Sequence, residues 1–209
     1  MMDNLFTIGH SQHTPEYFAD LLKKYGINYV LDVRSTPYSK YAEQFNKENI
    51  YSFLAKNNIK YSYMGKYFGA RPMELDLYSL EGYLDFEKVT HSEKFHIGME
   101  NVILGLERGN RIALMCTEKS PFDCHRAIMV ARAFDVNGIE VNHILSDGNI
   151  QTQRELDESL LDAYYSDRDQ LTLFNYQNVI SDKEYIIQAY RERNKEIGYR
   201  INQKQIVEV

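Results

Sequence analysis

Short apolar runs alternate with amphipathic helical stripes between residues 5 and 145. The apolar runs, each of a length suited to a buried strand, lie at residues 5–8, 29–33, 59–64, 111–116 and 139–145. The stripes, in which apolar residues recur every three or four positions, lie at residues 14–25, 47–57, 95–106 and 124–134. Strands that alternate with helices predict an α/β fold with a mainly parallel sheet and helices on both faces.

Two stretches depart from this alternation. Residues 65–89 hold several glycine and proline breakers, so we expect them to be irregular. The final sixty residues are mostly helical by pattern. We therefore expect an α/β domain at residues 1–149 and a helical C-terminal extension at residues 150–209 that packs on its core.

The composition is that of an ordinary globular protein. Of the 209 residues, 44% are hydrophobic and 26% are charged, which excludes a disordered or collagen-like chain. No apolar run reaches the length of a membrane span, and the first ten residues lack the features of a signal peptide. Two cysteines are too few for a disulfide scaffold. We expect a cytoplasmic protein with reduced thiols and no membrane partner.

Chemically capable side chains fall where the predicted strands end. In chain order they are Gly9, His10, Ser11, Asp32, Arg34, Ser35, Cys116, Glu118, Cys124, His125 and Arg126. Ligands of open parallel sheets bind at the carboxyl ends of the strands. Because these residues come from several elements and converge on that edge, we expect one functional site there.

The run Cys124-His125-Arg126 combines a thiol, an imidazole and a guanidinium in three consecutive residues. We expect Asp123 to cap a helix of which Cys124 is the first residue. A thiol in that position, beside Arg and His, has a lowered pKa, and the same backbone amides bind a phosphate or carboxylate. The run therefore fits a nucleophilic thiolate or an anion pocket in which Arg126 adds a bidentate contact. A packing role stays open for Cys124, and equally for Cys116, because free cysteines are often buried.

The remaining polar candidates divide between structure and function. Asp32 ends a buried strand, where a charge needs a partner such as Arg34 or Arg126. It either ties loops together or acts as a general base or as the group that orients a histidine. His10, at the mouth of the expected site, is assigned a functional role, whereas His143, inside the last strand, is expected to be structural.

The spacing of ligand-type residues gives little support to a metal or cofactor. The possible ligands are Cys116, Cys124, His125, His10 and Glu118. The pattern Cys-x7-Cys-His matches no common zinc motif. A reversible Cys116–Cys124 disulfide is a further alternative. The sequence holds neither a Gly-x-Gly-x-x-Gly motif nor a Walker-type loop, so we predict no metal and no cofactor.

The segment from Arg34 to Pro72 differs from the rest in charge. Seven basic and two acidic residues give it a charge of +5, while the remainder of the chain carries −11. Nine aromatic residues lie among these charges, including Tyr63. Basic residues interleaved with aromatics are typical of surfaces that bind single-stranded nucleic acid or nucleotides. A solvated lysine face in a tyrosine-rich chain explains the same pattern.

Six motifs follow one another in a fixed order. They are Thr7-Ile8-Gly9-His10-Ser11, Asp32-Val33-Arg34-Ser35-x-Pro37-x-Ser39, Gly69, Met115-Cys116-x-Glu118, Cys124-His125-Arg126 and Val141-x-His143-Ile144. In this order the chain resembles the domain-of-unknown-function 488 family over residues 5–148. It departs from the family at Phe68-Gly69, where a Leu-Gly pair is usual. The resemblance implies a compact α/β fold with the site at the strand ends, and it implies no particular reaction.

Three functions are consistent with these residues. The first is a cysteine-dependent transferase or hydrolase that acts on an anionic substrate, either a nucleotide, a nucleic acid or another phosphate or carboxylate compound. Its candidates for catalysis are Cys124, Cys116, His125, His10, Asp32 and Glu118. Its candidates for substrate binding are Arg34, Arg126, Ser11, Ser35, Gly9 and Tyr63. The alternatives are a non-catalytic nucleic-acid or nucleotide-binding module built on residues 34–72, and a thiol redox or metal sensor.

Overall fold

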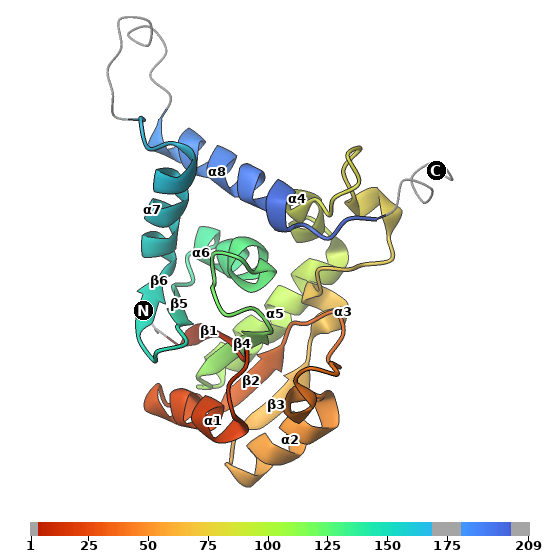
Figure 1. Ribbon diagram of the computed structural model, residues 1–209, viewed down its shortest axis with the longest axis vertical. Coiled ribbons are helices and arrows are strands. Elements are labelled where there is room, and N and C mark those ends of the chain that lie inside the picture. The colour runs from red at the N-terminus through yellow and green to blue at the C-terminus, as the bar shows by residue number, and fades with distance from the viewer. Residues whose placement is uncertain (1–3, 169–180, 202–209) are drawn as a thin grey trace, which may run out of the picture.

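The computed structural model describes residues 4–168 and 181–201 and centres on a six-stranded sheet (Figure 1). The strands are β1 (Leu5–Gly9), β2 (Tyr29–Asp32), β3 (Lys60–Tyr63), β4 (Ile112–Cys116), β5 (Val141–Ile144) and β6 (Ile150–Thr152). Their order across the sheet is β3-β2-β4-β1-β5-β6. The first five strands run parallel, and β6 pairs antiparallel with β5. The predicted α/β fold with a mainly parallel sheet is therefore confirmed.

Helices cover both faces of the sheet. They are α1 (Pro15–Lys24), α2 (Lys47–Lys56), α3 (Gly65–Phe68), α4 (Phe86–Thr90), α5 (Glu93–Glu107), α6 (Arg132–Val136), α7 (Gln153–Tyr164) and α8 (Asp182–Ile197). A π-helical turn at Arg126–Ala131 runs directly into α6. Figure 1 shows α1 and α2 on one side of the sheet and α5, α6 and α8 on the other.

Each face has its own apolar core because successive side chains of a strand point to opposite faces. Phe6 and Ile8 of β1 belong to the cluster that contains Phe18 of α1 and Leu54 of α2. Leu5 of the same strand belongs to the opposite cluster, which gathers side chains of α5, α6, α7 and α8. The residues at the strand ends thus lie between two packed layers.

Two segments differ from the sequence-based expectation. Residues 65–89, expected to be irregular, contain the short helices α3 and α4. The carboxylate of Asp85 caps α4 by accepting hydrogen bonds from the amides of Glu87 and Lys88. Residues 150–152, assigned to the helical extension, instead form β6. A strand of three residues is too short to leave a periodic pattern.

The C-terminal helical region is confirmed. Both helices begin with capping boxes, formed by Thr152 with Glu155 and by Ser181 with Glu184. Side chains of α7 and α8 join the same apolar cluster as one face of the sheet. The division between residues 149 and 150 into domain and extension stays a prediction.

No helix in the described ranges is both long and apolar enough to cross a membrane.

Candidate functional site

The ends of β2, β4 and β1 lie side by side, so the loops that follow them meet at one edge of the sheet. The pairing of β1 with β4 continues past the strand ends, where the amide of His10 donates to the carbonyl of Cys116 at 2.9 Å. This approach requires glycine at position 9, because a Cβ there would lie 1.9 Å from the carbonyl oxygen of Glu118. The geometry brings the residues after three strands into one neighbourhood.

Two thiols and an imidazole meet at this edge. The Sγ of Cys116 lies 3.7 Å from Nδ1 of His125, and the Sγ of Cys124 lies 4.0 Å from the same nitrogen. The other ring nitrogen of His125, Nε2, lies 3.1 Å from the carbonyl oxygen of Val33. A carbonyl only accepts, so Nε2 carries the hydrogen and donates it. In the neutral ring, Nδ1 therefore presents its lone pair to both sulfurs.

The two thiols differ in acidity. Burial on its own raises the pKa of Cys124, but the hydrogen bond from Cys116 and the positive charge of Arg126 bring it well below its usual value. The same hydrogen bond, together with burial, raises the pKa of Cys116 well above its usual value. Cys124 is therefore the more acidic thiol of the pair.

Arg126 is a fully buried cation beside these thiols. Its two terminal nitrogens donate to the carbonyls of Glu118 at 2.7 Å and Lys119 at 3.2 Å. Its Nε has no hydrogen-bond partner, and no ion pair joins Arg126 to a carboxylate within the described residues. A buried charge is costly without a counter-charge. A thiolate formed at Cys124 would supply that counter-charge, because the two groups interact electrostatically.

The start of the helix differs from the expected cap. The helix has His125 at its N-cap and no side-chain cap hydrogen bond, so the prediction that Asp123 caps it is wrong. The carboxylate of Asp123 instead forms an ion pair with Arg193 of α8. The carbonyl of Cys124 accepts the first helical hydrogen bonds, from the amides of Ala127 and Ile128. Cys124 therefore lies directly before the N-cap residue, His125, and is not the first residue of the helix. The π-helical turn that follows is a rare feature that is frequent at functional sites.

Asp32 and Arg34 form a closed buried network. Nε and one terminal nitrogen of Arg34 donate to the two carboxylate oxygens of Asp32 at 2.8 Å and 2.6 Å. The same terminal nitrogen also donates to the carbonyl of Phe45 at 2.8 Å. The hydroxyl of Tyr61 donates to Asp32 at 2.7 Å. Of the two roles considered for Asp32, this geometry supports the one that ties loops together.

His10 lies in this network instead of facing the thiols. Its Nδ1 lies 3.1 Å from the carbonyl oxygen of Ser11, and its Nε2 lies 3.1 Å from a terminal nitrogen of Arg34. The ring stacks on Phe45 with centroids 4.3 Å apart. Burial and the charge of Arg34 lower the pKa of His10 to about 4, so the ring is neutral at pH 7. Both of its nitrogens are occupied by structural partners.

His143 occupies the structural position expected for it. Its Nδ1 accepts from the hydroxyl of Thr7 at 2.8 Å, and its Nε2 donates to the amide oxygen of Gln153 at 3.0 Å. Gln153 in turn donates to the hydroxyl of Tyr190 at 2.6 Å. Burial lowers the pKa of His143 to about 3. This chain of hydrogen bonds joins β1 and β5 to the two C-terminal helices.

The remaining candidates, three for substrate binding and Glu118 for catalysis, lie at or after the ends of β1, β2, β3 and β4. The hydroxyl of Tyr63 donates to the carbonyl of Ser35 at 2.8 Å. Ser11 adopts a positive φ of 44° after the end of β1. Glu118 is exposed, and burial of its carboxyl group, followed by the charge on Cys124, raises its pKa. Of these four residues, only Glu118 is linked electrostatically to the thiols.

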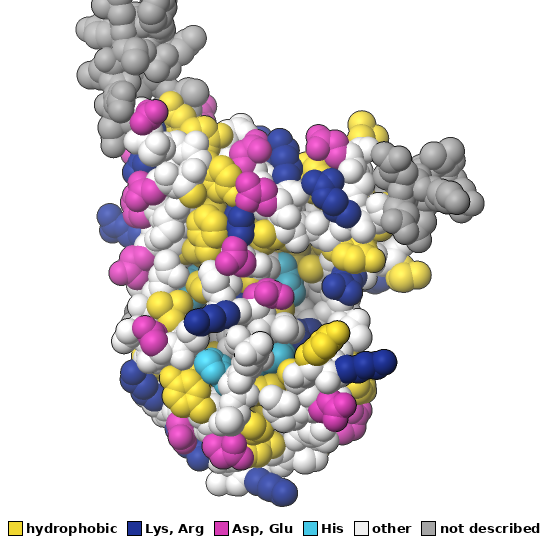
Figure 2. Space-filling view, in the orientation of Figure 1, with side chains coloured by type: hydrophobic (Ala, Val, Ile, Leu, Met, Phe, Trp, Pro, Cys, Tyr) yellow, Lys and Arg dark blue, Asp and Glu magenta, His cyan; other side chains and the backbone are white. Residues whose placement is uncertain are grey.

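The basic, tyrosine-rich segment does not form one aromatic surface. Tyr38, Tyr41 and Tyr51 are exposed, whereas Phe45 and Phe68 are buried in the two cores. Figure 2 shows acidic and basic side chains intermixed over the face it displays. A surface for nucleic acid concentrates positive charge. The segment therefore gives less support to the binding-module hypothesis than its net charge suggests.

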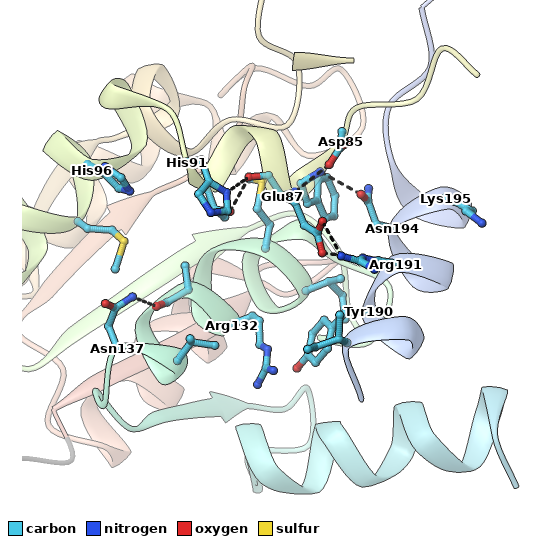
Figure 3. Close-up of a pocket in the computed structure, with 18 of the residues that line it drawn as sticks. Asp85, Glu87, His91, His96, Arg132, Asn137, Tyr190, Arg191, Asn194 and Lys195 are labelled. Carbon is cyan, nitrogen blue, oxygen red and sulfur yellow. Dashed lines mark hydrogen bonds and ion pairs between the residues drawn. The ribbon is translucent and has the colours of Figure 1, made fainter. Parts of the chain in front are cut away.

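A cavity of about 960 Å³ lies elsewhere, between α4, α5, the π-helical turn, α6 and α8. Its floor is apolar and includes Met99 and Met129. Figure 3 shows Glu87 of α4 facing Arg191 of α8 across one end, with Nε of the arginine 2.8 Å from the carboxylate. Arg132 pairs with Asp135 and Asp157. The charges of Glu87, Arg191 and Arg132 are thus balanced by ion pairs within the protein.

Two residues that contact the site or its network were missed by sequence reasoning. Tyr61 counts in the sequence only as one of the aromatics of its segment. In the sheet it lies opposite Val30, two residues before Asp32 on β2, and its hydroxyl reaches the carboxylate of Asp32. Arg193 lies in the C-terminal region, far from every motif, and no sequence signal connects it to Asp123. The contact of His125 with the carbonyl of Val33 could not be predicted either, because any residue type provides a backbone carbonyl.

Fold and site together define an α/β protein with a thiol, imidazole and guanidinium cluster at the carboxyl ends of its central strands. The chain belongs to the family described as Domain of unknown function DUF488, whose model matches residues 14–133. The matched range is shorter than residues 5–148, so the motifs at Thr7–Ser11 and Val141–Ile144 lie outside it. No curated protein and no solved structure matched the chain.

Proposed function

We propose that the protein is a cysteine-dependent enzyme, a transferase or hydrolase, with Cys124 as its nucleophile. Its substrate in this proposal is an anion, either a nucleotide, a nucleic acid or another phosphate or carboxylate compound. The supporting observation is Arg126, a buried guanidinium with a free Nε and no carboxylate partner among the described residues. It lies beside two thiols and an imidazole that are within reach of one another.

Each residue of the cluster has a role in this proposal. His125 takes the thiol proton at Nδ1, because its Nε2 is held by Val33. The Sγ of Cys124 then attacks an electrophilic carbon or phosphorus, and the leaving group departs with the electrons of the broken bond. Cys116 keeps its proton and donates a hydrogen bond to the thiolate. Water or an acceptor molecule breaks the covalent intermediate, and in this proposal Glu118, which interacts electrostatically with Cys124, takes up the proton.

Substrate access requires local opening. Cys116 and Cys124 are only 5% and 1% exposed. The segment 117–123 joins the two cysteines and its first three residues are exposed, so in this proposal it is the part that moves. A reactive thiol pair of this kind keeps its reduced form in the cytoplasm, which is the compartment we propose.

Site-resolved alkylation tests the assignment of the nucleophile. With limiting iodoacetamide in the presence of EDTA, mass spectrometry should find Cys124 labelled at least about tenfold faster than Cys116. Inorganic phosphate should slow the labelling of Cys124 relative to sodium chloride of equal ionic strength. His125→Gln should slow it as well, whereas the exposed His96→Gln serves as the matched control. Preferential labelling of Cys116, or no effect of phosphate, would contradict the proposal.

A further inference from the structure

The three donor atoms at the site have the separations of a metal centre. The Sγ atoms of Cys116 and Cys124 and Nδ1 of His125 all lie within 4.8 Å of one another, with sulfur–nitrogen distances of 3.7 Å and 4.0 Å. A tetrahedral zinc ion with bonds of about 2.3 Å to sulfur and about 2.0 Å to nitrogen places such donors about 3.6 Å apart. Small side-chain shifts therefore suffice to enclose an ion.

The orientation of His125 also suits a metal ligand. A ligating imidazole usually donates its second N–H to a carbonyl or carboxylate, which fixes the ring and its tautomer. Here Nε2 of His125 donates to the carbonyl of Val33 at 3.1 Å. The free lone pair at Nδ1 is left pointing toward the two sulfurs. The hydrogen bond at Nε2 and the orientation of Nδ1 toward the sulfurs are thus both in place before an ion binds.

The three donor residues lie in or directly beside regular secondary structure. Cys116 is the last residue of the central strand β4, and Cys124 and His125 stand at the start of the helix that packs on it. Both sulfurs are buried, so little water competes for the ion. The sequence spacing resembles no common zinc motif, but the fold brings the donors together across a seven-residue loop.

We propose that Cys116, Cys124 and His125 bind one thiophilic divalent cation, Zn²⁺, with an anion in the fourth position. Binding forms two Zn–S bonds and one Zn–N bond, and the two thiols release their protons to solvent. Two thiolates balance the charge of Zn²⁺, which leaves the buried charge of Arg126 without a counter-charge. An anionic fourth ligand restores the balance, so the site is open to a small anion.

The metal site coincides with the site of the proposed function, but the two are separable. A zinc-bound thiolate is a poor nucleophile, so the metal-bound and the alkylation-competent forms are alternatives. Alkylation in EDTA reports the proposed function alone. Spectroscopy of the metal-loaded protein reports the metal site alone.

Titration of the reduced full chain with Co²⁺ tests the site. We expect one equivalent to produce a sulfur-to-cobalt charge-transfer band and tetrahedral visible bands, both removed by Zn²⁺. Cys116→Ser, Cys124→Ser and His125→Gln should each reduce these signals several-fold, while His96→Gln leaves them unchanged. A cobalt spectrum without the thiolate band, or one that persists in both cysteine variants, overturns the proposal.

A second measurement needs no variant at the site. One equivalent of Zn²⁺ added to the unaltered protein should protect both cysteines from iodoacetamide, and EDTA should restore their labelling. Unchanged labelling rates at saturating Zn²⁺ would also overturn the metal site. That outcome would leave the alkylation pattern in EDTA, and with it the proposed function, intact.

Discussion

At the scale of single residues, the site depends on which partner each polar atom meets. His125 gives one nitrogen to a backbone carbonyl and the other to two sulfurs. Arg34 and Arg126 are both buried, but they differ in their counter-charge. Arg34 forms an ion pair with a carboxylate, and Arg126 forms none among the described residues. The first arginine therefore belongs to the scaffold, and the second is available to the chemistry of the thiols.

The scaffold role of Asp32 predicts large effects on stability. Asp32→Asn leaves Arg34 buried without its counter-charge and should lower the free energy of unfolding by about 3–5 kcal/mol. Tyr61→Phe removes one hydrogen bond to the carboxylate and should cost about 1.5–3 kcal/mol. Urea denaturation measures both changes. Tyr51→Phe, at an exposed neighbouring ring, is the matched control, and equal losses for Tyr61→Phe and Tyr51→Phe would disprove this role.

Sequence reasoning found the members of the site better than their contacts. The strand-end argument correctly gathered Cys116, Cys124 and His125, because parallel strands end at a common edge. It could not show that His10 turns to Arg34 and away from the thiols, since that depends on the side-chain packing against Phe45. Ligand spacing likewise gives no sign of the proposed metal site, because the donors meet in space and not along the chain.

At the scale of elements, the loop before Cys124 is held by the last helix. Arg193 of α8 forms an ion pair with Asp123 and donates to the carbonyl of Phe122 at 3.0 Å. Its guanidinium also lies 4.5 Å from the centroid of the Phe122 ring. Figure 1 shows α8 running from α7 to α4 across the helices on this side of the sheet. The C-terminal region, outside the matched family range, thus contacts the loop that carries the candidate nucleophile.

Removal of this contact should loosen the loop locally. Arg193→Ala is expected to lower the free energy of unfolding by about 1–2 kcal/mol and to speed hydrogen exchange in residues 117–124. Arg191→Ala breaks the exposed ion pair with Glu87 on the same helix and should cost at most about 1 kcal/mol. Exchange mass spectrometry compares the two variants. If residues 117–124 exchange at the same rate in both variants, Arg193 does not stabilise this loop.

Elements were predictable where they were long and periodic. The strands that became β1 to β5 and the longer helices of the sheet layers followed from apolar runs and stripes. The misses were short: α3 and α4 lie among breaking residues, and β6 has three residues. Such short elements are stabilised by tertiary contacts and caps. Their sequences are too short to show a periodic pattern that would predict them.

At the scale of the whole molecule, the C-terminal helices and the sheet share one core and one buried polar chain. Leu156 and Leu160 of α7 and Ala189 of α8 pack in the cluster of the sheet face. The chain Thr7, His143, Gln153 and Tyr190 crosses from the sheet to both helices. We therefore expect a single cooperative unfolding transition. Far-ultraviolet circular dichroism and tyrosine fluorescence should coincide in urea, and two separate transitions would contradict a shared core.

Buried neutral histidines make stability depend on pH. The pKa of His10 is lowered to about 4 in the fold, whereas an unfolded histidine titrates near 6.5, so the unfolded chain binds protons that the folded chain does not. Stability is complete above about pH 6.5 and falls as the pH drops toward 4, by about 3 kcal/mol for His10. His10→Asn should remove its share of this dependence and leave the share of His143, whose pKa is lowered to about 3, and the exposed His96→Gln should remove neither. If the His10 variant loses as much stability as the wild type between pH 6.5 and pH 4, the proposal that His10 is buried as a neutral ring is refuted.

The charge selectivity of Cys124 tests the central claim most directly. Iodoacetate and iodoacetamide share one reaction and differ in charge, so their rate ratio reports whether the thiolate sits in an anion site. In EDTA, the ratio at Cys124 should exceed that of free glutathione by about tenfold, which corresponds to about 1.4 kcal/mol. Arg126→Gln should abolish the excess, and Arg132→Gln, on the same helical segment, should preserve it. A ratio equal to that of glutathione would contradict an enzyme that uses Cys124 on anionic substrates.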